Sequence, residues 1–124
     1  MENQERSMDL IRLLLIAHIT GEVPPEVQQH DARTIVYHYT LLKDADFIDA
    51  VFAEGNGPIP DEVNPASIRV KWLGHEFHDA SKESKLWKMA KEHFMKEGVS
   101  FTATAVLAYL KYELHKRIPS IPST

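Results

Sequence analysis

The chain has 124 residues and a net charge of −4, with 44% apolar residues, 26% charged residues and no cysteine. This length suits one compact domain, and the composition is that of a soluble globular protein rather than a disordered or membrane-embedded one. Disulfides and thiolate chemistry are excluded. The longest apolar stretch, residues 13–17, is too short for a membrane span or a signal-peptide core, so we expect a cytoplasmic protein with no membrane partner.

Charge is unevenly divided along the chain. Residues 1–64 carry four basic and twelve acidic side chains, 4 − 12 = −8, whereas residues 65–124 carry ten basic and six acidic ones, 10 − 6 = +4. Two halves of opposite sign could pair head to tail in a homodimer or attract a charged partner. The alternative is that both are ordinary solvated surfaces, because net charge bears on solubility and association rather than on a specific site.

The first predicted helix begins after Ser7, a suitable N-cap, and ends at Gly21. The apolar side chains at helical spacing within it are Met8, Ile11, Leu14, Leu15 and Ile19. Residues 23–26 (Val-Pro-Pro-Glu) then break the pattern and leave room for a single helical turn before His30.

A second long helix is predicted over residues 31–45, with Asp31 as its N-cap. One face of this helix is apolar and should point inward; it collects Ile35, His38, Tyr39, Leu42 and Ala45. The imidazole of His38 is therefore expected to be packed and hydrogen-bonded rather than to act as a proton shuttle.

A β-hairpin is predicted next. At Asp46 the chain must turn from helix to strand, a place where left-handed backbone is often needed and Asp is tolerated. Residues 47–53 and 67–72 have strand character and are separated by turn residues, so we expect them to pair antiparallel around a long tip, the wing. The acidic residues of this tip are Glu54, Asp61 and Glu62.

Helices fill the rest of the predicted chain. A short one is expected from Gly74 to about Ser81, and another, marked by Leu86, Met89, Ala90, His93 and Phe94, is stopped by Gly98. Ser100 or Thr102 is placed to cap a last helix. Its apolar stripe comprises Ala103, Val106, Leu107, Leu110 and Leu114.

The fold class is therefore predicted as α+β, mostly α: a winged helix-turn-helix-like domain with a β-hairpin wing and additional C-terminal helices. We expect a single domain over residues 1–124, with the winged-helix core at 8–80, the C-terminal helices at 84–118 and a frayed tail at 119–124.

The chain also resembles a family of short bacterial and prophage proteins, the domain of unknown function 2513. The likeness covers most of the chain and rests on residues 8–12, 37–38 and 41–42 with Ile48, 72–79 and 86–88. Its most specific part is the Trp-Leu-Gly-His-Glu-Phe run, in which we interpret Trp72, Gly74, His75 and Phe77 as a structural motif. The chain departs from the family's usual pattern at residues 70–71, at His78 and at Asp46, where the family commonly has Gly. The resemblance supports a winged helix and does not indicate which biochemical activity, if any, the chain has.

Residues 75–79 contain candidate metal-ligating or catalytic side chains. His75 and His78 share a helix face, and Asp79 lies four residues after His75, but this is not the His-Glu-x-x-His spacing of zinc proteases. A metal needs three or four convergent ligands with an ordered second shell. We therefore expect His75 to be a partly buried structural histidine and His78 a surface residue, with no metal, no cofactor and no enzymatic activity.

The helix at residues 31–45 is the counterpart of a DNA-recognition helix. The side chains expected to face a partner are Arg33, Tyr37, Thr40 and Lys43. Two cations make a weak basic stripe, and the acidic wing would meet phosphates with like charge. DNA binding is thus disfavoured but open.

The C-terminal half offers two more surfaces. Lysines on the helix around Trp87 form a cationic exposed side, which suits either an acidic partner or plain solvation. Tyr109 and Tyr112 lie outside the apolar stripe of the last helix, where they suit a contact with a second chain, although core packing explains them nearly as well. The leading hypothesis is a non-catalytic winged-helix module that binds an unidentified protein or itself; the alternative is a DNA-binding transcriptional regulator using residues 31–45.

Overall fold

The computed structural model describes residues 6–53, 57, 60–96 and 102–117. It begins with α1 (Met8–Thr20), where the Ser7 hydroxyl accepts a hydrogen bond from the Leu10 N–H at 3.1 Å and Gly21 ends the helix at φ +83°. A 3₁₀ turn, η1 (Pro25–Gln29), precedes α2 (Ala32–Asp44), whose Asp31 cap accepts from the Thr34 N–H at 2.7 Å. The caps and bounds predicted for both helices are confirmed.

The turn predicted at Asp46 is also confirmed. Asp46 has φ +66° and is the single non-glycine residue with positive φ in the described part of the chain. Asp is among the few residues that tolerate this left-handed backbone. The turn brings the Phe47 side chain into the core, fully buried, at the start of the hairpin.

The hairpin is antiparallel as predicted, but its ladders are short. β1 (Ile48–Asp49) pairs with β4 (Arg69–Val70), with Ile48 opposite Val70, and β2 (Phe52–Ala53) pairs with β3 (Glu62–Val63), with Phe52 opposite Val63. A 3₁₀ turn, η2 (Pro65–Ser67), separates β3 from β4. The continuous strands predicted over 47–53 and 67–72 are therefore wrong in extent, because the five residues between β3 and β4 face only two between β1 and β2.

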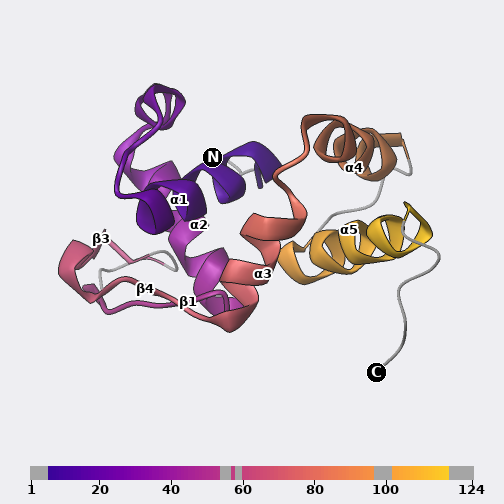
Figure 1. Cartoon of the computed structure of the whole chain (residues 1–124). Helices are drawn as coiled ribbons and strands as arrows, with labels where there is room; N and C mark the ends of the chain where they lie inside the picture. The colour runs from indigo at the N-terminus through magenta and orange to yellow at the C-terminus, as the bar shows by residue number, and fades with distance from the viewer. Residues whose placement is uncertain (1–5, 54–56, 58–59, 97–101, 118–124) are drawn as a thin grey trace.

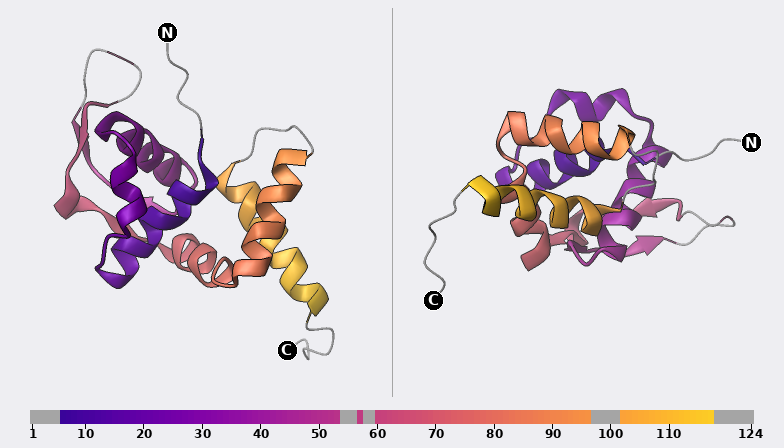
Figure 2. Two further views of the ribbon diagram at one scale, coloured as in Figure 1. Left: turned by 90° about the horizontal axis from the view of Figure 1, so that it is seen from above. Right: turned by 90° about the vertical axis from the view of Figure 1, so that its right-hand side faces the viewer.

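The chain then forms α3 (Trp72–Ala80), α4 (Ser84–Lys96) and α5 (Ala103–Arg117). Figures 1 and 2 show α4 and α5 next to each other, on the side of α3 that faces away from the hairpin. The Thr102 hydroxyl accepts from the Ala105 N–H at 3.0 Å, so the predicted cap at this position is confirmed. α3 begins at Trp72, two residues before the predicted start. The predicted stop at Gly98, the cap at Ser100 and the tail at 119–124 lie outside the described residues.

A shared hydrophobic cluster joins these helices. Each helix contributes fully buried side chains to it, among them Leu10, Leu42, Phe77, Leu86 and Leu110. The fold is thus α+β and mostly α, as predicted.

Polar contacts tie α1 to the C-terminal helices. The Asp9 carboxylate accepts from Trp87 Nε1 at 2.8 Å and from Lys91 Nζ at 3.1 Å. Burial acts to raise the pKa of Asp9, but these hydrogen bonds outweigh it and hold the pKa below its usual value. Arg12 Nε donates to the Ser81 carbonyl at 3.0 Å and its guanidinium lies 5.5 Å from the Trp87 ring centroid.

Candidate interaction surface

The two faces of α3 differ sharply in exposure. Gly74 and Phe77 point inward and are buried, whereas the Trp72 side chain is 76% exposed and His75 is exposed beside it, three residues along the same helix face. Trp72 and His75 are therefore exposed rather than packed in the core, and the partial burial expected for His75 is wrong. The helix begins at Trp72, so this side chain projects from the first turn instead of packing as the end of a strand.

Gly74 fixes how α3 sits on the hairpin. A Cβ at this position would lie 2.8 Å from Val70 Cγ1 and closer still to the carbonyl oxygen of Phe47. That carbonyl accepts from the Lys71 N–H at 2.8 Å. Because the backbones approach this closely, the N-terminal turn of α3 is held against the Asp46–Phe47 turn and Trp72 is presented outward.

Ion pairs lie on the segments around Trp72. Lys71 Nζ lies 2.5 Å from Asp46 Oδ1, and this hydrogen bond raises the pKa of Lys71. On the adjoining strands Arg69 lies 2.7 Å from Asp49, and farther along α3 Glu76 lies 3.4 Å from Lys111 of α5. An exposed indole among paired charges has the composition of an interface centre with a polar rim.

The four α2 residues predicted to face a partner differ in exposure and in the contacts that they make. Arg33 is exposed, but Tyr37 and Thr40 are half-buried and the Thr40 hydroxyl donates to the Tyr37 carbonyl at 2.6 Å. Lys43 Nζ donates to the Ala50 carbonyl at 2.8 Å and lies 5.6 Å from the Phe52 ring centroid. Lys43 thus ties α2 to the hairpin.

The predicted acidic wing is described in part. Asp61 and Glu62 are exposed, while Glu54 lies outside the described residues. The exposed carboxylates of Asp61 and Glu62 make this part of the hairpin surface negatively charged.

The three histidines considered as candidate site residues differ in burial. His38 is fully buried: its Nε2 accepts from the Ser7 N–H at 2.8 Å and its Nδ1 lies 2.8 Å from the Thr34 carbonyl, which fixes the neutral tautomer with the proton on Nδ1. Burial lowers the pKa of His38, and the packed imidazole predicted there is confirmed. His75 is exposed rather than partly buried. His78 is half-buried, and burial lowers its pKa. Within the described residues no three His, Asp or Glu side chains are grouped so that they could hold a metal ion.

The tyrosines of α5 lie in two different environments. Tyr109 is half-buried and stacks on His93 of α4, with ring centroids 4.6 Å apart. Tyr112 is 63% exposed, and Lys116 Nζ lies 5.1 Å from its ring centroid. Tyr109 therefore packs within the α4–α5 pair, and Tyr112 is the member of the two that reaches solvent.

In the part of the chain that the structure describes, no helix combines the length and the apolar composition needed to span a bilayer.

Comparison with known proteins gives a family and no activity. The chain is 25% identical over 109 residues to a protein of Haemophilus influenzae described as "Uncharacterized protein", covering 82% of this chain and 88% of the relative. No solved structure matches it. The family profile described as "Hypothetical protein (DUF2513)" matches residues 5–100, which include α1 to α4 and exclude α5. The chain therefore belongs to the DUF2513 family.

Proposed function

We propose that this protein is a non-catalytic, winged-helix-type binding module that acts through protein–protein contact, a second copy of the chain included. The contact surface is the outward face of α3, centred on Trp72. The observation that carries the proposal is the 76% exposure of the Trp72 side chain on a helix whose opposite face is buried.

The free energy available from burying the Trp72 indole favours its burial against another protein. Full burial of a large apolar side chain stabilises a fold or a complex by about 1.5–3 kcal/mol. Because the Trp72 side chain is 76% exposed in the isolated chain, most of this stabilisation is available only on contact with a partner. Tryptophan is among the residues most enriched at the energetic centres of protein interfaces. The ion pairs at Lys71, Arg69 and Glu76 supply the polar surroundings that such centres have.

The DNA-binding alternative has weaker support. A duplex reader generally presents several cations to phosphates. Of the cations on α2 and the hairpin, Lys43, Arg69 and Lys71 already contact a carbonyl or a carboxylate, and Arg33 alone in this described region has no such contact.

The proposal is tested by placing a photoreactive phenylalanine analogue at position 72 or 112 of the full chain and crosslinking in the native host. We expect a discrete adduct, identified by mass spectrometry, from position 72 and none of the same mass from position 112. The adducted protein, or the chain itself, is then titrated against wild type, Trp72→Ala and Tyr112→Ala by sedimentation or calorimetry.

Trp72→Ala should weaken this binding at least tenfold, and Tyr112→Ala should leave it within twofold, as a centre contributing about 2 kcal/mol or more requires. Equal binding by Trp72→Ala and wild type would refute the proposal, as would loss of binding in Tyr112→Ala alone.

The alternative is tested by fluorescence anisotropy with duplex DNA over a salt series. We expect no binding in the micromolar range. Micromolar binding with a steep salt slope, weakened by Arg33→Ala plus Lys43→Ala, would favour the DNA-binding regulator instead.

A further inference from the structure

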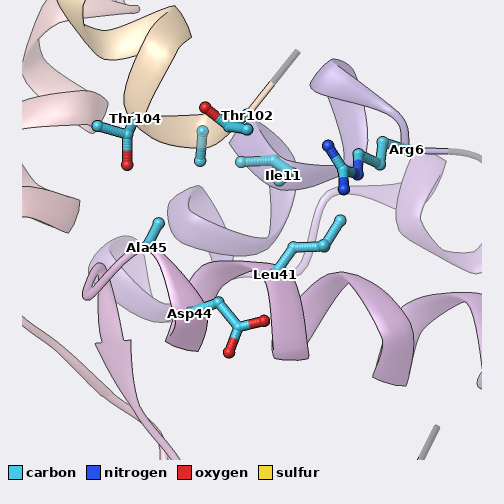
Figure 3. Close-up of a pocket in the computed structure, with 8 residues that line it drawn as sticks. Arg6, Ile11, Leu41, Asp44, Ala45, Thr102 and Thr104 are labelled. Carbon is cyan, nitrogen blue, oxygen red and sulfur yellow. The ribbon is translucent and has the colours of Figure 1, made fainter. Parts of the chain in front are cut away.

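The start of α1 borders two hollows in the described part of the chain. One, of about 270 Å³, lies where the start of α1, the end of α2 and the start of α5 meet, and apolar side chains from all three helices contribute to its lining (Figure 3). The other, of about 460 Å³, lies between the start of α1 and the 3₁₀ turn η1. Its lining is largely polar and comprises Ser7, Asp9, Arg12, Leu13, Glu26, Gln29 and His30.

The stretch of α1 that lines this second hollow also contacts α4. Asp9 accepts hydrogen bonds from Trp87 and Lys91, and the Arg12 guanidinium lies over the Trp87 ring. Figures 1 and 2 show η1, the purple coil between α1 and α2, and α4 on the upper side of α1, whereas α3 and the hairpin lie below it. One face of the molecule therefore carries two walls, η1 and α4, with the start of α1 between them.

The η1 wall is acidic. Residues 21–30 include Glu22 and Glu26 and no lysine or arginine. Both glutamates are exposed, and neither side chain makes an ion pair or a hydrogen bond within the described residues. Val23 lies beside Glu22 and is 58% exposed. The η1 wall thus combines unpaired negative charge with an exposed apolar side chain.

The α4 wall is basic, since α4 carries four lysines against one glutamate. Lys91 is paired with Asp9, but Lys85 and Lys88 are exposed and have no ion pair or hydrogen bond in the part of the chain that the structure describes. Met95 is 80% exposed. Lys88 lies three residues before Lys91 and Met95 four residues after it, so both share the side of α4 that meets α1.

We propose that this face joins two copies of the chain in a two-fold dimer, in which the η1 wall of each copy lies against the α4 wall of the other. A two-fold interface makes each contact twice, because a residue pair formed in one direction is also formed in the other. Walls of opposite charge on a single face satisfy this relation, and opposite charges across an interface also fix its register.

In this dimer Glu22 and Glu26 pair with Lys85 and Lys88 of the second copy, and the exposed apolar side chains of the two walls cover each other. The interface does not include the outward face of α3. The dimer therefore leaves Trp72 exposed for the contact proposed above, and the two proposals can fail separately.

The first experiment is sedimentation velocity of the full chain over a concentration series at low ionic strength. We expect a monomer–dimer equilibrium with a dissociation constant of about 100 µM or tighter. No larger species should form, because a two-fold contact closes on itself. Raising the salt concentration from about 50 mM to about 500 mM should weaken the dimer at least threefold, since salt screens exposed charges.

Charge-reversal variants identify the two walls. Glu22→Lys with Glu26→Lys, and Lys85→Glu with Lys88→Glu, should each weaken the homodimer at least tenfold, because like charges then meet at both contacts. An equimolar mixture of the two double variants should form a heterodimer within about threefold of the wild-type affinity, because opposite charges face each other again. A merely structural effect of the substitutions would not be reversed by mixing.

Control variants separate this interface from net charge and from the α3 surface. Asp61→Lys with Glu62→Lys makes the same change in net charge on the hairpin and should leave the dimer within twofold of wild type, as should Trp72→Ala. The milder pair Glu22→Gln with Glu26→Gln, which introduces no repulsion, should still weaken the dimer at least threefold.

A chain that stays monomeric at about 0.5 mM in low salt, a concentration above the expected dissociation constant, would overturn the proposal. Growth beyond dimers, equal weakening by the hairpin control, or a mixture of the two reversed variants that remains monomeric would overturn it as well. Loss of the dimer in Trp72→Ala would place self-association on α3 instead.

Discussion

The inward and outward faces of α3 show how neighbouring residues of one sequence run take opposite roles. Phe77 is 1% exposed and packs against Phe47 and Trp87, with ring centroids 5.3 and 5.8 Å away. Trp72, five positions earlier, is 76% exposed. The Trp-Leu-Gly-His-Glu-Phe run therefore does not form one packing unit: its Gly and Phe hold the helix in place, and its Trp and His face solvent.

The sharpest test of the inward face is Phe77→Ala. Removing this ring should destabilise the protein by about 3–5 kcal/mol, because it leaves a cavity between two other buried aromatic rings. Urea unfolding followed by far-UV circular dichroism measures the loss, with His75→Ala as the exposed control on the same helix. A loss below about 1 kcal/mol would show that Phe77 is not a core residue.

Gly74→Ala tests the contact between α3 and the hairpin. The new methyl group would collide with the Phe47 carbonyl and the Val70 side chain, so we expect a loss of about 1–3 kcal/mol. This loss would occur even though alanine is the better helix former by about 1 kcal/mol. The same unfolding assay measures it, and increased stability would contradict the close approach of the two backbones.

Acidification should act through the inward-facing His38 of α2. Its folded pKa lies below the unfolded value of 6.5, so at low pH the unfolded chain binds a proton that the folded chain excludes. The stability contributed by neutral His38 is complete above about pH 6.5 and is lost as pH falls toward the folded pKa, by at most about 1.4 kcal/mol per pH unit.

This pH dependence is measured by urea unfolding at about pH 7.5 and about pH 5.5. His38→Gln should flatten it, since no proton is then taken up at this position, while the exposed His75→Gln should keep the wild-type slope. Equal slopes for His38→Gln and wild type would show that another group carries the effect. The next to replace are the half-buried His78 and the more exposed His18, whose pKa values partial desolvation also lowers.

The smallest expected effect on stability is that of Trp72→Ala. An exposed side chain contributes little to the fold, so the free energy of unfolding should change by no more than about 0.5 kcal/mol. A loss comparable to that of Phe77→Ala would remove the contrast between the two faces and, with it, the argument for an interaction surface.

Local rules were enough to predict the helices and the turn. Ser7 and Asp31 act as caps, Gly21 ends α1 and Asp46 adopts the left-handed conformation, because each depends on hydrogen bonds or backbone preferences within a few residues. The apolar stripes of α2 and α5 were likewise legible from spacing.

The start of α3, the contact of Lys43 and the position of the pocket depend on tertiary contacts, which the sequence pattern does not predict. The start of α3 depends on the approach of Gly74 to Phe47, residues 27 positions apart, and this contact turns Trp72 outward. Lys43 was predicted to face a partner, but its Nζ donates a hydrogen bond to the Ala50 carbonyl, on the far side of the helix-to-strand turn. A pocket lined by Arg6, Asp44 and Ala103 lies where the start of α1, the end of α2 and the start of α5 meet. Helical periodicity within one segment cannot predict such a meeting of separate helices. A lone glycine two residues after Trp72 was the one local sign that the helix might approach another backbone closely.

The exposure of Trp72 also gives the protein a built-in optical probe. The chain has two tryptophans, and the second, Trp87, is 5% exposed. A water-borne quencher such as iodide should therefore reach one indole and spare the other, which divides the intrinsic fluorescence into an accessible and a shielded component. Any molecule that settles over the start of α3 would protect the accessible component, so occupancy of that face can be followed without attaching a dye.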